Sequence, residues 1–341
     1  MQAWFSTTPL EKRLFTETDI RETTNLLQRT SSRDAWSRIP RIYIVLRVID
    51  RLEHIKTFIA QGITDVWFPF SQTSLPQGFQ PLTARLDFIE AQSTVCNKKA
   101  LNLERGTGHG HFRDATEVPL RKIGELGKGA YGFVDRVVST ISHREYARKL
   151  IPRGRTFKRD QAVLRAFERE LSNLKKLSQH RHIVKLVASY TDPKYVGIIM
   201  SPVADTNLAN FLRQSLKDEG RSCLRTFFGC LTSALGFLHN NRIRHKDIKP
   251  ANVLVKSSNV FLTDFGISLD WSGQDQSTTT GTTFSTPRYC APEVANHSAR
   301  NSLADIWSLG CVFLEIWTVL KCDTTTALEA HMRSNGTMTV S

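Results

Sequence analysis

The pattern of apolar and polar positions predicts a helical segment at the start of the chain. Apolar residues recur at helical spacing, with charges between them, in segments 10–30, 39–62 and 82–95. Gly62 is expected to end the second helix, and the proline-rich segment 63–82 is not expected to be helical. Residues 1–103 are therefore expected to form a mostly α-helical region, in which the sequence shows no catalytic motif.

A different pattern follows a short glycine-rich segment. Residues 104–117, ERGTGHGHFRDATE, are typical of a linker, and His109 and His111 are expected to be solvated in it. Strands are expected over 121–139 and 144–151, a strongly amphipathic helix over 158–177, and further strands around 182–190 and 196–202. Helices dominate from Leu208 onward. Residues 118–341 thus have the order of an α+β fold with a β-rich lobe, a helical lobe and a cleft between them.

Composition places the chain among soluble globular proteins. Its 341 residues suit two domains, and 40% are hydrophobic and 23% charged. The start, MQAWFSTTPLEKRLF, lacks the apolar run of a signal peptide, and the apolar stretches IYIVL and CVFLEIWTVL are too short to span a bilayer. The six cysteines form no CxxC pair, which indicates reduced thiols. We expect a soluble cytoplasmic or nuclear protein with no membrane partner.

The net charge of +14 raises the question of nucleic-acid binding. Lysine and arginine are spread along the whole chain, and their densest cluster, Arg148 to Arg159, has no interleaved aromatic platform beyond Phe157. Acidic protein partners or substrates are therefore favoured over nucleic acid.

Three glycines in the first expected hairpin indicate a loop that approaches phosphate. Gly127, Gly129 and Gly132 form GxGxxG, followed by Val134. A strand rather than a helix follows the glycines, which argues against a dinucleotide fold. Glycine lets backbone amides approach phosphate oxygens closely, so a loop over polyphosphate is the favoured interpretation.

Charged residues with complementary chemistry follow in order. Lys149 lies in the expected strand YARKLI, and Glu170 on the next helix is a possible partner for it. Asp247 precedes Asn252 with the spacing D-x-x-x-x-N, and TDFG then supplies Asp264. Asn252 and Asp264 offer the hard oxygen ligands that Mg²⁺ prefers, which leaves Asp247 to orient a hydroxyl and accept its proton.

Residues 118 to about 320 resemble the eukaryotic protein kinase superfamily. The family's motifs appear in order as the glycine-rich loop, Ala147-x-Lys149, Glu170, HKDIKPAN at 245–252, DFG at 264–266, APE at 291–293 and DIWSLG from Asp305. The resemblance implies a two-lobed fold that binds ATP and Mg²⁺ and phosphorylates a protein substrate. Lysine two residues after Asp247 and STPRY before APE are more similar to serine/threonine kinases than to tyrosine kinases.

The resemblance also implies a role for each matching residue. Lys149 would hold the α- and β-phosphates and pair with Glu170, while Asp247 would be the catalytic base. Lys249 would lie near the transferred phosphoryl group, and Asn252 and Asp264 would bind Mg²⁺. Asp305 would brace the catalytic loop from a buried helix. The adenine site would be formed by the gatekeeper Met200, the hinge residue Val203, and Val134, Ala147 and Leu254 around the ring.

Two features depart from the family pattern. Lys246 replaces the arginine that commonly meets a phosphorylated activation segment, so we expect activity to depend less on phosphorylation of the Ser- and Thr-rich segment from Ser268 to Thr286, which includes Thr278–Thr283. Only about twenty residues follow CVFLEIWTVL, so the expected C-terminal lobe is truncated. Glu293 is then expected to be a buried carboxylate without its family arginine, and apolar surface of the lobe is expected to lack cover.

Two functions remain open at this point. The sequence favours an ATP- and Mg²⁺-dependent serine/threonine protein kinase, because every catalytic residue is present. The alternative is a truncated, kinase-like scaffold that binds nucleotide or a partner without turnover. The N-terminal region resembles helical extensions that precede kinase domains in some fungal proteins, and a regulatory partner is one possible role for it.

Overall fold

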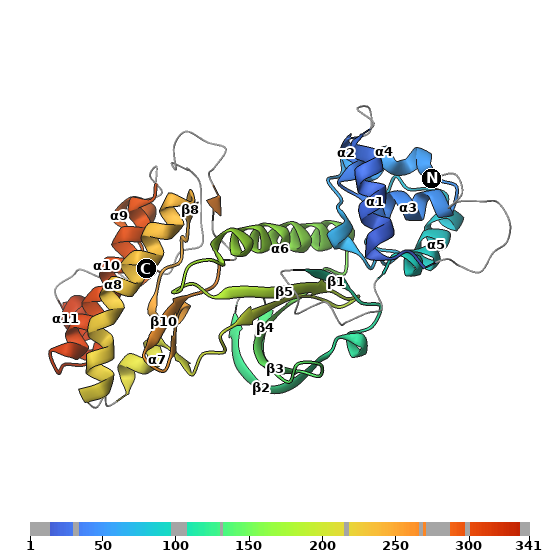
Figure 1. The fold of residues 1–341 in the computed structure, drawn as a ribbon. Coiled ribbons are helices and arrows are strands. Elements are labelled where there is room, and N and C mark those ends of the chain that lie inside the picture. Colours follow the sequence, from blue (N-terminus) through green and yellow to red (C-terminus); the bar gives the residue numbers. More distant parts are fainter. Residues whose placement is uncertain are drawn as a thin grey trace. The chain divides into compact units, whose positions relative to one another are not determined.

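The structure is a computed structural model that describes residues 14–29, 34–96, 108–129, 132–214, 218–265, 269–270, 287–296 and 301–334. Its contacts divide the chain into two compact units (Figure 1). The first contains residues 1–168 and 187–199, and the second contains residues 169–186 and 200–341. The first holds the N-terminal helices and the β-rich lobe, and the second holds the helical lobe.

A six-stranded sheet forms the centre of the β-rich lobe. Its strand order is β1(His109–His111), β5(Lys185–Thr191), β6(Tyr195–Ser201), β4(Glu145–Pro152), β3(Gly132–Ser139) and β2(Leu120–Gly129). Strands β2, β3 and β4 form an antiparallel meander, and β1 pairs with β5 in parallel. The strands expected from alternation and from the glycine-rich turn are therefore confirmed.

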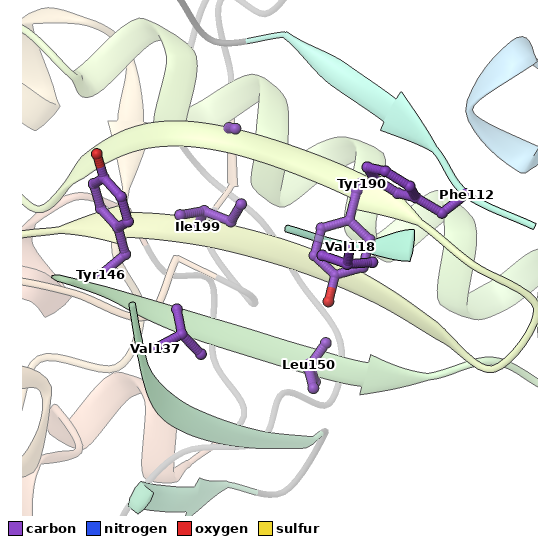
Figure 2. Close-up of a cluster of buried hydrophobic side chains, with 8 residues drawn as sticks. Phe112, Val118, Val137, Tyr146, Leu150, Tyr190 and Ile199 are labelled. Carbon is purple, nitrogen blue, oxygen red and sulfur yellow. The ribbon is translucent and has the colours of Figure 1, made fainter. Parts of the chain in front are cut away.

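The two faces of the meander have different roles because side chains alternate along a strand. Val137, Tyr146 and Leu150 point into a buried apolar cluster with Tyr190 and Ile199 (Figure 2). The cluster brings together side chains from β3, β4, β5 and β6, and burying one face of β3 and β4 fixes the register of their pairing. The opposite face of β3 and β4 is thereby left to carry the expected phosphate- and adenine-binding residues.

The N-terminal region is helical, as expected. Its helices are α1(Glu17–Gln28), α2(Asp34–Ser37), α3(Pro40–Val48), α4(Ile55–Ala60) and α5(Leu82–Ala91), with 3-10 turns at Leu52–His54, Asp65–Trp67 and Gln92–Thr94. A capping box between Thr16 and Asp19 begins α1. The non-helical segment 63–81 supplies much of the core through the buried rings of Trp67, Phe68 and Phe79.

The expected single helix over 39–62 is wrong. Helix α3 ends at Val48, and Asp50 adopts a left-handed backbone with φ of 53° before a second helix begins at Ile55. Helical periodicity continues across the break because both helices bury apolar faces in one core. Gly62, with φ of 62°, ends α4 as expected.

The side chain of Asp65, more than twenty residues later in the sequence, caps the N-terminus of helix α3. Its carboxylate accepts hydrogen bonds from the backbone N–H of Arg41 (2.7 Å) and Ile42 (3.1 Å), which have no partner within the helix. Burial raises the pKa of Asp65 to about 6, although the nearby Arg41 and these N–H groups lower it. The folded protein therefore binds this proton more tightly than the unfolded chain does, since the usual pKa is 3.8.

This pKa predicts a stability that falls as pH rises. Protonated Asp65 contributes its full stabilisation below about pH 4, and the contribution is lost as pH rises through about 6. The free energy of unfolding of wild type, minus that of Asp65→Asn, should fall by about 2 kcal/mol between pH 4 and pH 7. Urea unfolding across this range measures the difference, and a constant difference would contradict the assignment.

Residues 108–117 connect the helices to the sheet and contain strand β1 and a 3-10 turn at Ala115–Glu117. The interpretation of His111 as solvated is wrong, whereas His109 is half-buried with its Nδ1 2.8 Å from the hydroxyl of Ser189. His111 is 3% exposed, and its Nδ1 lies 3.0 Å from the carbonyl oxygen of Phe68 and 2.9 Å from the hydroxyl of Thr191. Burial lowers the pKa of His111 well below its usual value.

Helix α6(Phe157–Leu177) follows β4 as the expected amphipathic helix. Leu164 and Phe167 are fully buried, and the Phe167 ring lies 5.8 Å from the ring of His109. Apart from Ala162 and Ser172, the exposed positions of α6 carry arginine and lysine, which agrees with the charged face that the sequence shows.

The second unit is mainly helical. Its helices are α7(Leu208–Arg213), α8(Asp218–Asn240), α9(Pro292–Ala295), α10(Leu303–Leu320) and α11(Thr325–Ser334). Short strands form a three-stranded sheet in the order β10(Asn259–Leu262), β9(Val253–Lys256) and β7(Thr206–Asn207). A two-stranded sheet pairs β11(Leu269–Asp270) with β8(Ile243–Arg244). The pairing of Leu269 with Arg244 holds β11 beside the strand that follows α8.

Helix α10 extends the apolar stretch CVFLEIWTVL toward the N-terminus, so the apolar helix is longer than the stretch identified from the sequence. Within the described ranges it is the one helix that could cross a membrane by length and composition, so the stretch is not too short by that criterion. A core helix has the same composition, and α10 carries buried Asp305 and Glu315. The expectation of uncovered apolar surface is confirmed for α10, where Leu303, Trp307 and Trp317 are 49–60% exposed.

Candidate active site

Asp305 on α10 holds the start of residues 245–252, the expected catalytic loop. This carboxylate is 3% exposed and accepts hydrogen bonds from the backbone N–H of His245 (2.9 Å) and Lys246 (2.8 Å). His239 on α8 donates a third from Nε2, at 3.0 Å. Burial raises the pKa of Asp305, but the bond from His239, the nearby His245 and the two N–H groups together lower it below its usual value. The expected bracing role of Asp305 is confirmed.

His245 connects the loop 245–252 to the segment that precedes Asp264. Its Nε2 lies 3.0 Å from the carbonyl oxygen of Thr263, and its Nδ1 accepts a hydrogen bond from the N–H of Asp247 at 3.3 Å. The ring therefore carries its proton on Nε2. Sequence reasoning assigned no role to His245 or His239. The position of His245 inside the HKD motif was an available signal, whereas His239 has none.

Asp247, Lys249 and Asn252 converge in the loop. Oδ2 of Asp247 lies 2.7 Å from Nζ of Lys249 and accepts a hydrogen bond from Nδ2 of Asn252 at 2.8 Å. The same Asn252 nitrogen donates to the carbonyl oxygen of Asp247, also at 2.8 Å. The structure thus places three of the predicted residues in direct contact, with the Asp247 carboxylate oriented by two donors.

Two residues of this site have a left-handed backbone. Lys246 has φ of 69° and Asp264 has φ of 66°, which costs on the order of 1 kcal/mol or more for residues other than glycine. The bonds to Asp305 maintain the first conformation, and Thr263 N–H to Asn252 O at 3.1 Å fixes the chain next to the second. Residues Thr278–Thr283 lie outside the described residues. The reduced dependence of activity on phosphorylation of this segment therefore stays a prediction.

The first unit carries the glycine-rich hairpin and Lys149. Lys149 lies directly opposite Val134, and Val134 lies opposite Gly127, so these positions share one face of β2–β4. Ala147, two residues before Lys149, lies on the same face and is 7% exposed. This face is opposite the one that contributes Val137, Tyr146 and Leu150 to the buried cluster.

Gly132 is required by the packing of the hairpin. A Cβ atom there would lie 2.1 Å from the carbonyl oxygen of Leu150, whereas a Cβ at Gly127 would meet nothing within 4 Å. We expect Gly132→Ala to lower the free energy of unfolding by about 2 kcal/mol or more. Gly127→Ala, the matched control, should change it by less than about 0.5 kcal/mol in the same denaturation experiment. Equal effects of the two substitutions would refute this account.

The remaining predicted residues are placed as follows. Glu170 lies on α6 and is 4% exposed. Met200 at the end of β6 and Val203 after it are buried, and Leu254 on β9 is half-buried. Glu170, Met200, Val203 and Leu254 belong to the second unit, and Lys149, Val134 and Ala147 belong to the first.

Asn252 and Asp264 have suitable chemistry for a magnesium ion. The Asn252 side chain faces two acceptors of Asp247, the main-chain oxygen and Oδ2, so the amide nitrogen must point toward them. The amide oxygen of Asn252 can therefore serve as a metal ligand. Among the described residues no group of three His, Cys, Asp or Glu side chains could hold a metal. Two oxygen ligands from the protein fit Mg²⁺, which keeps water and phosphate in the rest of its shell.

The expectation that Glu293 is buried is wrong. Glu293 on α9 is only half-buried, so solvent reaches its carboxylate. The buried carboxylate nearby is Glu315 of α10, which lies 3.0 Å from Nη2 of Arg288 and accepts a hydrogen bond from the Tyr289 hydroxyl at 2.7 Å. Arg288 also pairs with Glu329 of α11. These contacts connect the segment before APE to both helices.

Comparison with known proteins agrees with this geometry. The family described as "Protein kinase domain" matches residues 120–334, which is more than half of the chain. The chain belongs to the protein kinase domain family. The two lobes, the glycine-rich hairpin and the loop around Asp247 are therefore the parts of a kinase domain, as the sequence predicts.

Three relatives show how far the similarity reaches. Serine/threonine-protein kinase 33 of Mus musculus is 31% identical over 200 residues, covering 55% of this chain and 39% of its own length. Mitogen-activated protein kinase kinase kinase 15 of Mus musculus is 34% identical over 197 residues, which is 57% of this chain and 14% of that protein. Cyclin-dependent kinase 4 homolog of Caenorhabditis elegans is 33% identical over 201 residues, covering 56% and 48%. The chain thus spans less than half the length of each.

Proposed function

We propose that the chain is a serine/threonine protein kinase that transfers the γ-phosphoryl group of ATP to a protein hydroxyl with the help of Mg²⁺. The observation that carries the proposal is the convergence of Lys249 and Asn252 on one carboxylate oxygen of Asp247. A surface ion pair between Lys249 and Asp247 would need neither a second donor from Asn252 nor a loop braced by a buried aspartate.

In this proposal each residue has one task. ATP supplies the phosphoryl group, and Mg²⁺ supplies positive charge beside its phosphate oxygens. Asp247 orients the substrate hydroxyl and accepts its proton, while Lys249 places a positive charge near the transferred group. Lys149 binds phosphate oxygens as a point charge. Asn252 and Asp264 hold the metal through oxygen atoms.

Serine and threonine are the proposed acceptors for two reasons. Lys249 follows Asp247 by two residues, as in the kinases with this specificity that the sequence resembles. The relative from Mus musculus with 31% identity is named a serine/threonine-protein kinase. The net charge of +14 favours acidic protein substrates or partners, and we propose a cytoplasmic or nuclear location.

A scaffold that binds a partner without turnover is the second candidate. The exposed apolar side chains of α10 favour it, because Leu303, Trp307 and Trp317 form a surface that a partner could cover. Thermal unfolding with and without Mg·ATP would reveal nucleotide binding in either case. Turnover is what separates the two candidates.

The deciding experiment is a transfer assay with acidic and basic protein substrates. Wild type should form phosphoserine or phosphothreonine from Mg·ATP, and Asp264→Ala should form far less because it lacks a metal ligand. Equal product from the two proteins, or phosphotyrosine alone, would overturn the proposed function.

A further inference from the structure

Residues 61–69 of the helical region contact one face of helix α6. The carbonyl oxygen of Gln61 accepts hydrogen bonds from Nε2 of Gln161 (3.0 Å) and Nη2 of Arg165 (2.9 Å). The Thr64 hydroxyl bonds to the Glu168 carboxylate. The rings of Trp67 and Phe157 lie 6.0 Å apart. Positions 157, 161, 165 and 168 are spaced by one helical turn, so the contacts follow a single stripe along α6.

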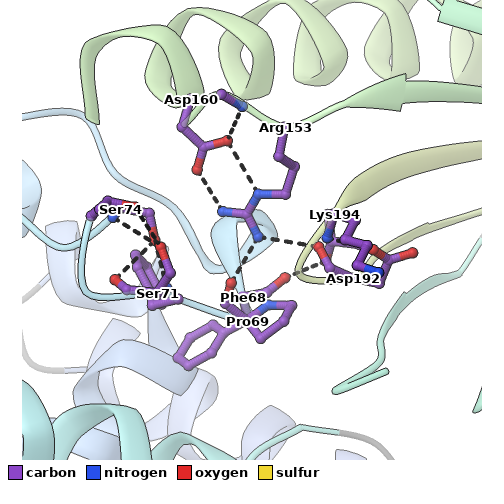
Figure 3. Close-up of polar contacts among 12 residues, drawn as sticks. Phe68, Pro69, Ser71, Ser74, Arg153, Asp160, Asp192 and Lys194 are labelled. Carbon is purple, nitrogen blue, oxygen red and sulfur yellow. Dashed lines mark hydrogen bonds and ion pairs between the residues drawn. The ribbon is translucent and has the colours of Figure 1, made fainter. Parts of the chain in front are cut away.

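A buried ion pair fixes the beginning of the same helix. Arg153 binds Asp160 through Nε (3.2 Å) and Nη2 (2.7 Å), and the two side chains are 5% and 2% exposed (Figure 3). Nη1 of Arg153 donates to the carbonyl oxygen of Pro69 at 2.7 Å. The chain before α6 is thus attached to the helical region by a charge that has little access to water.

The contacted helix also carries a predicted site residue, which lies on a different face from the contacted stripe. Glu170 follows Glu168 by two positions in the same helix and is 4% exposed. An α-helix is stiff over these lengths, since each turn is hydrogen-bonded to the next. Holding positions 157–168 in place therefore restricts where the Glu170 carboxylate can lie.

We propose that residues 61–69 act as a clamp on α6 that positions Glu170, so that the helical N-terminal region sets the activity of the kinase domain. The inference rests on the proposed function, because a position for Glu170 matters only to a reaction that uses it. Gln161, Arg165 and Glu168 are positioning residues in this account and do not touch the reacting atoms.

The polar nature of the clamp distinguishes it from a purely stabilising contact. Arg165 is exposed, and its bond goes to a main-chain oxygen, so its loss costs little apolar burial. A contact that only stabilises the fold would change the melting temperature and leave the turnover number of the folded protein unaltered. The clamp predicts a change in turnover number instead.

The test compares Gln161→Ala/Arg165→Ala with Arg159→Ala, an exposed arginine on α6 whose side chain makes none of these contacts. Loss of two hydrogen bonds should lower kcat about fivefold or more, with the KM for the protein substrate nearly unchanged. Hydrogen exchange of residues 169–177 should become faster by a similar factor. In a Glu170→Gln background the double substitution should lower kcat no further, because both changes act through the same side chain.

The outcomes separate the clamp from the proposed function. Turnover and exchange equal to those of Arg159→Ala would overturn the clamp. A wild type without transfer would refute the proposed function alone, and the exchange of residues 169–177 would still decide the clamp, faster exchange supporting it and unchanged exchange overturning it. Should the double variant fail to fold, Thr64→Val removes the bond to Glu168 from the other side, with the same expected results.

Discussion

Asp247→Asn is expected to lower kcat for phosphoryl transfer about a thousandfold, because it removes the only group in the loop assigned to accept the hydroxyl proton. The substituted amide keeps the size of the carboxylate, and its oxygen can still accept the bond from Nδ2 of Asn252. The loop should therefore keep its shape. A transfer assay at saturating Mg·ATP measures the loss.

Two controls give this prediction its meaning. Asp323→Asn neutralises an exposed carboxylate that lies outside the loop, and should leave kcat unchanged. The rise in melting temperature on adding Mg·ATP should be similar for wild type and Asp247→Asn, since the base is not assigned to nucleotide binding. A kcat for Asp247→Asn within about tenfold of wild type would exclude Asp247 as the base.

Arg153→Ala is expected to lower the free energy of unfolding by about 3–5 kcal/mol. The substitution leaves the Asp160 carboxylate buried at 2% exposure without its cation, and removes the donor to the Pro69 carbonyl. The expected cost is mainly that of an uncompensated buried charge. Chemical denaturation followed by circular dichroism measures it.

The same chain offers an exposed ion pair for comparison. Arg136 and Glu145 are joined by a similar arginine–carboxylate contact, but their side chains are 47% and 43% exposed. Arg136→Ala should therefore cost less than about 1 kcal/mol. Adding Asp160→Asn to Arg153→Ala should recover part of the lost stability, because the buried charge is then removed as well. Equal costs for the two arginines would contradict the role given to burial.

Features that depend on local patterns were predictable from the sequence. The strands β2–β4 follow from alternation around GxGxxG, and α6 follows from its 3.6-residue period. The HKDIKPAN and DFG motifs placed Asp247, Asn252 and Asp264 in their loops, and DIWSLG predicted that Asp305 braces the loop that begins at His245. Each of these inferences uses residues close in sequence or a specific set of motifs.

Features that depend on distant contacts were not predictable. His111 is buried because β1 pairs with β5 about eighty residues later, which the polar, glycine-rich segment around it does not indicate. The break at Asp50 leaves the helical period intact, so periodicity alone could not find it. The bonds of His245 to Thr263 and of Arg153 to Pro69 likewise arise only when separate segments meet.

The most direct test of the central claim is the identity of the residue that this protein phosphorylates. Purified wild type should transfer the γ-phosphoryl group of Mg·ATP to serine or threonine of an acidic or basic protein substrate, as located by mass spectrometry, and Asp247→Asn should yield at least a hundredfold less product. Serine or threonine phosphorylation at equal levels with both proteins, or with neither, would contradict the account.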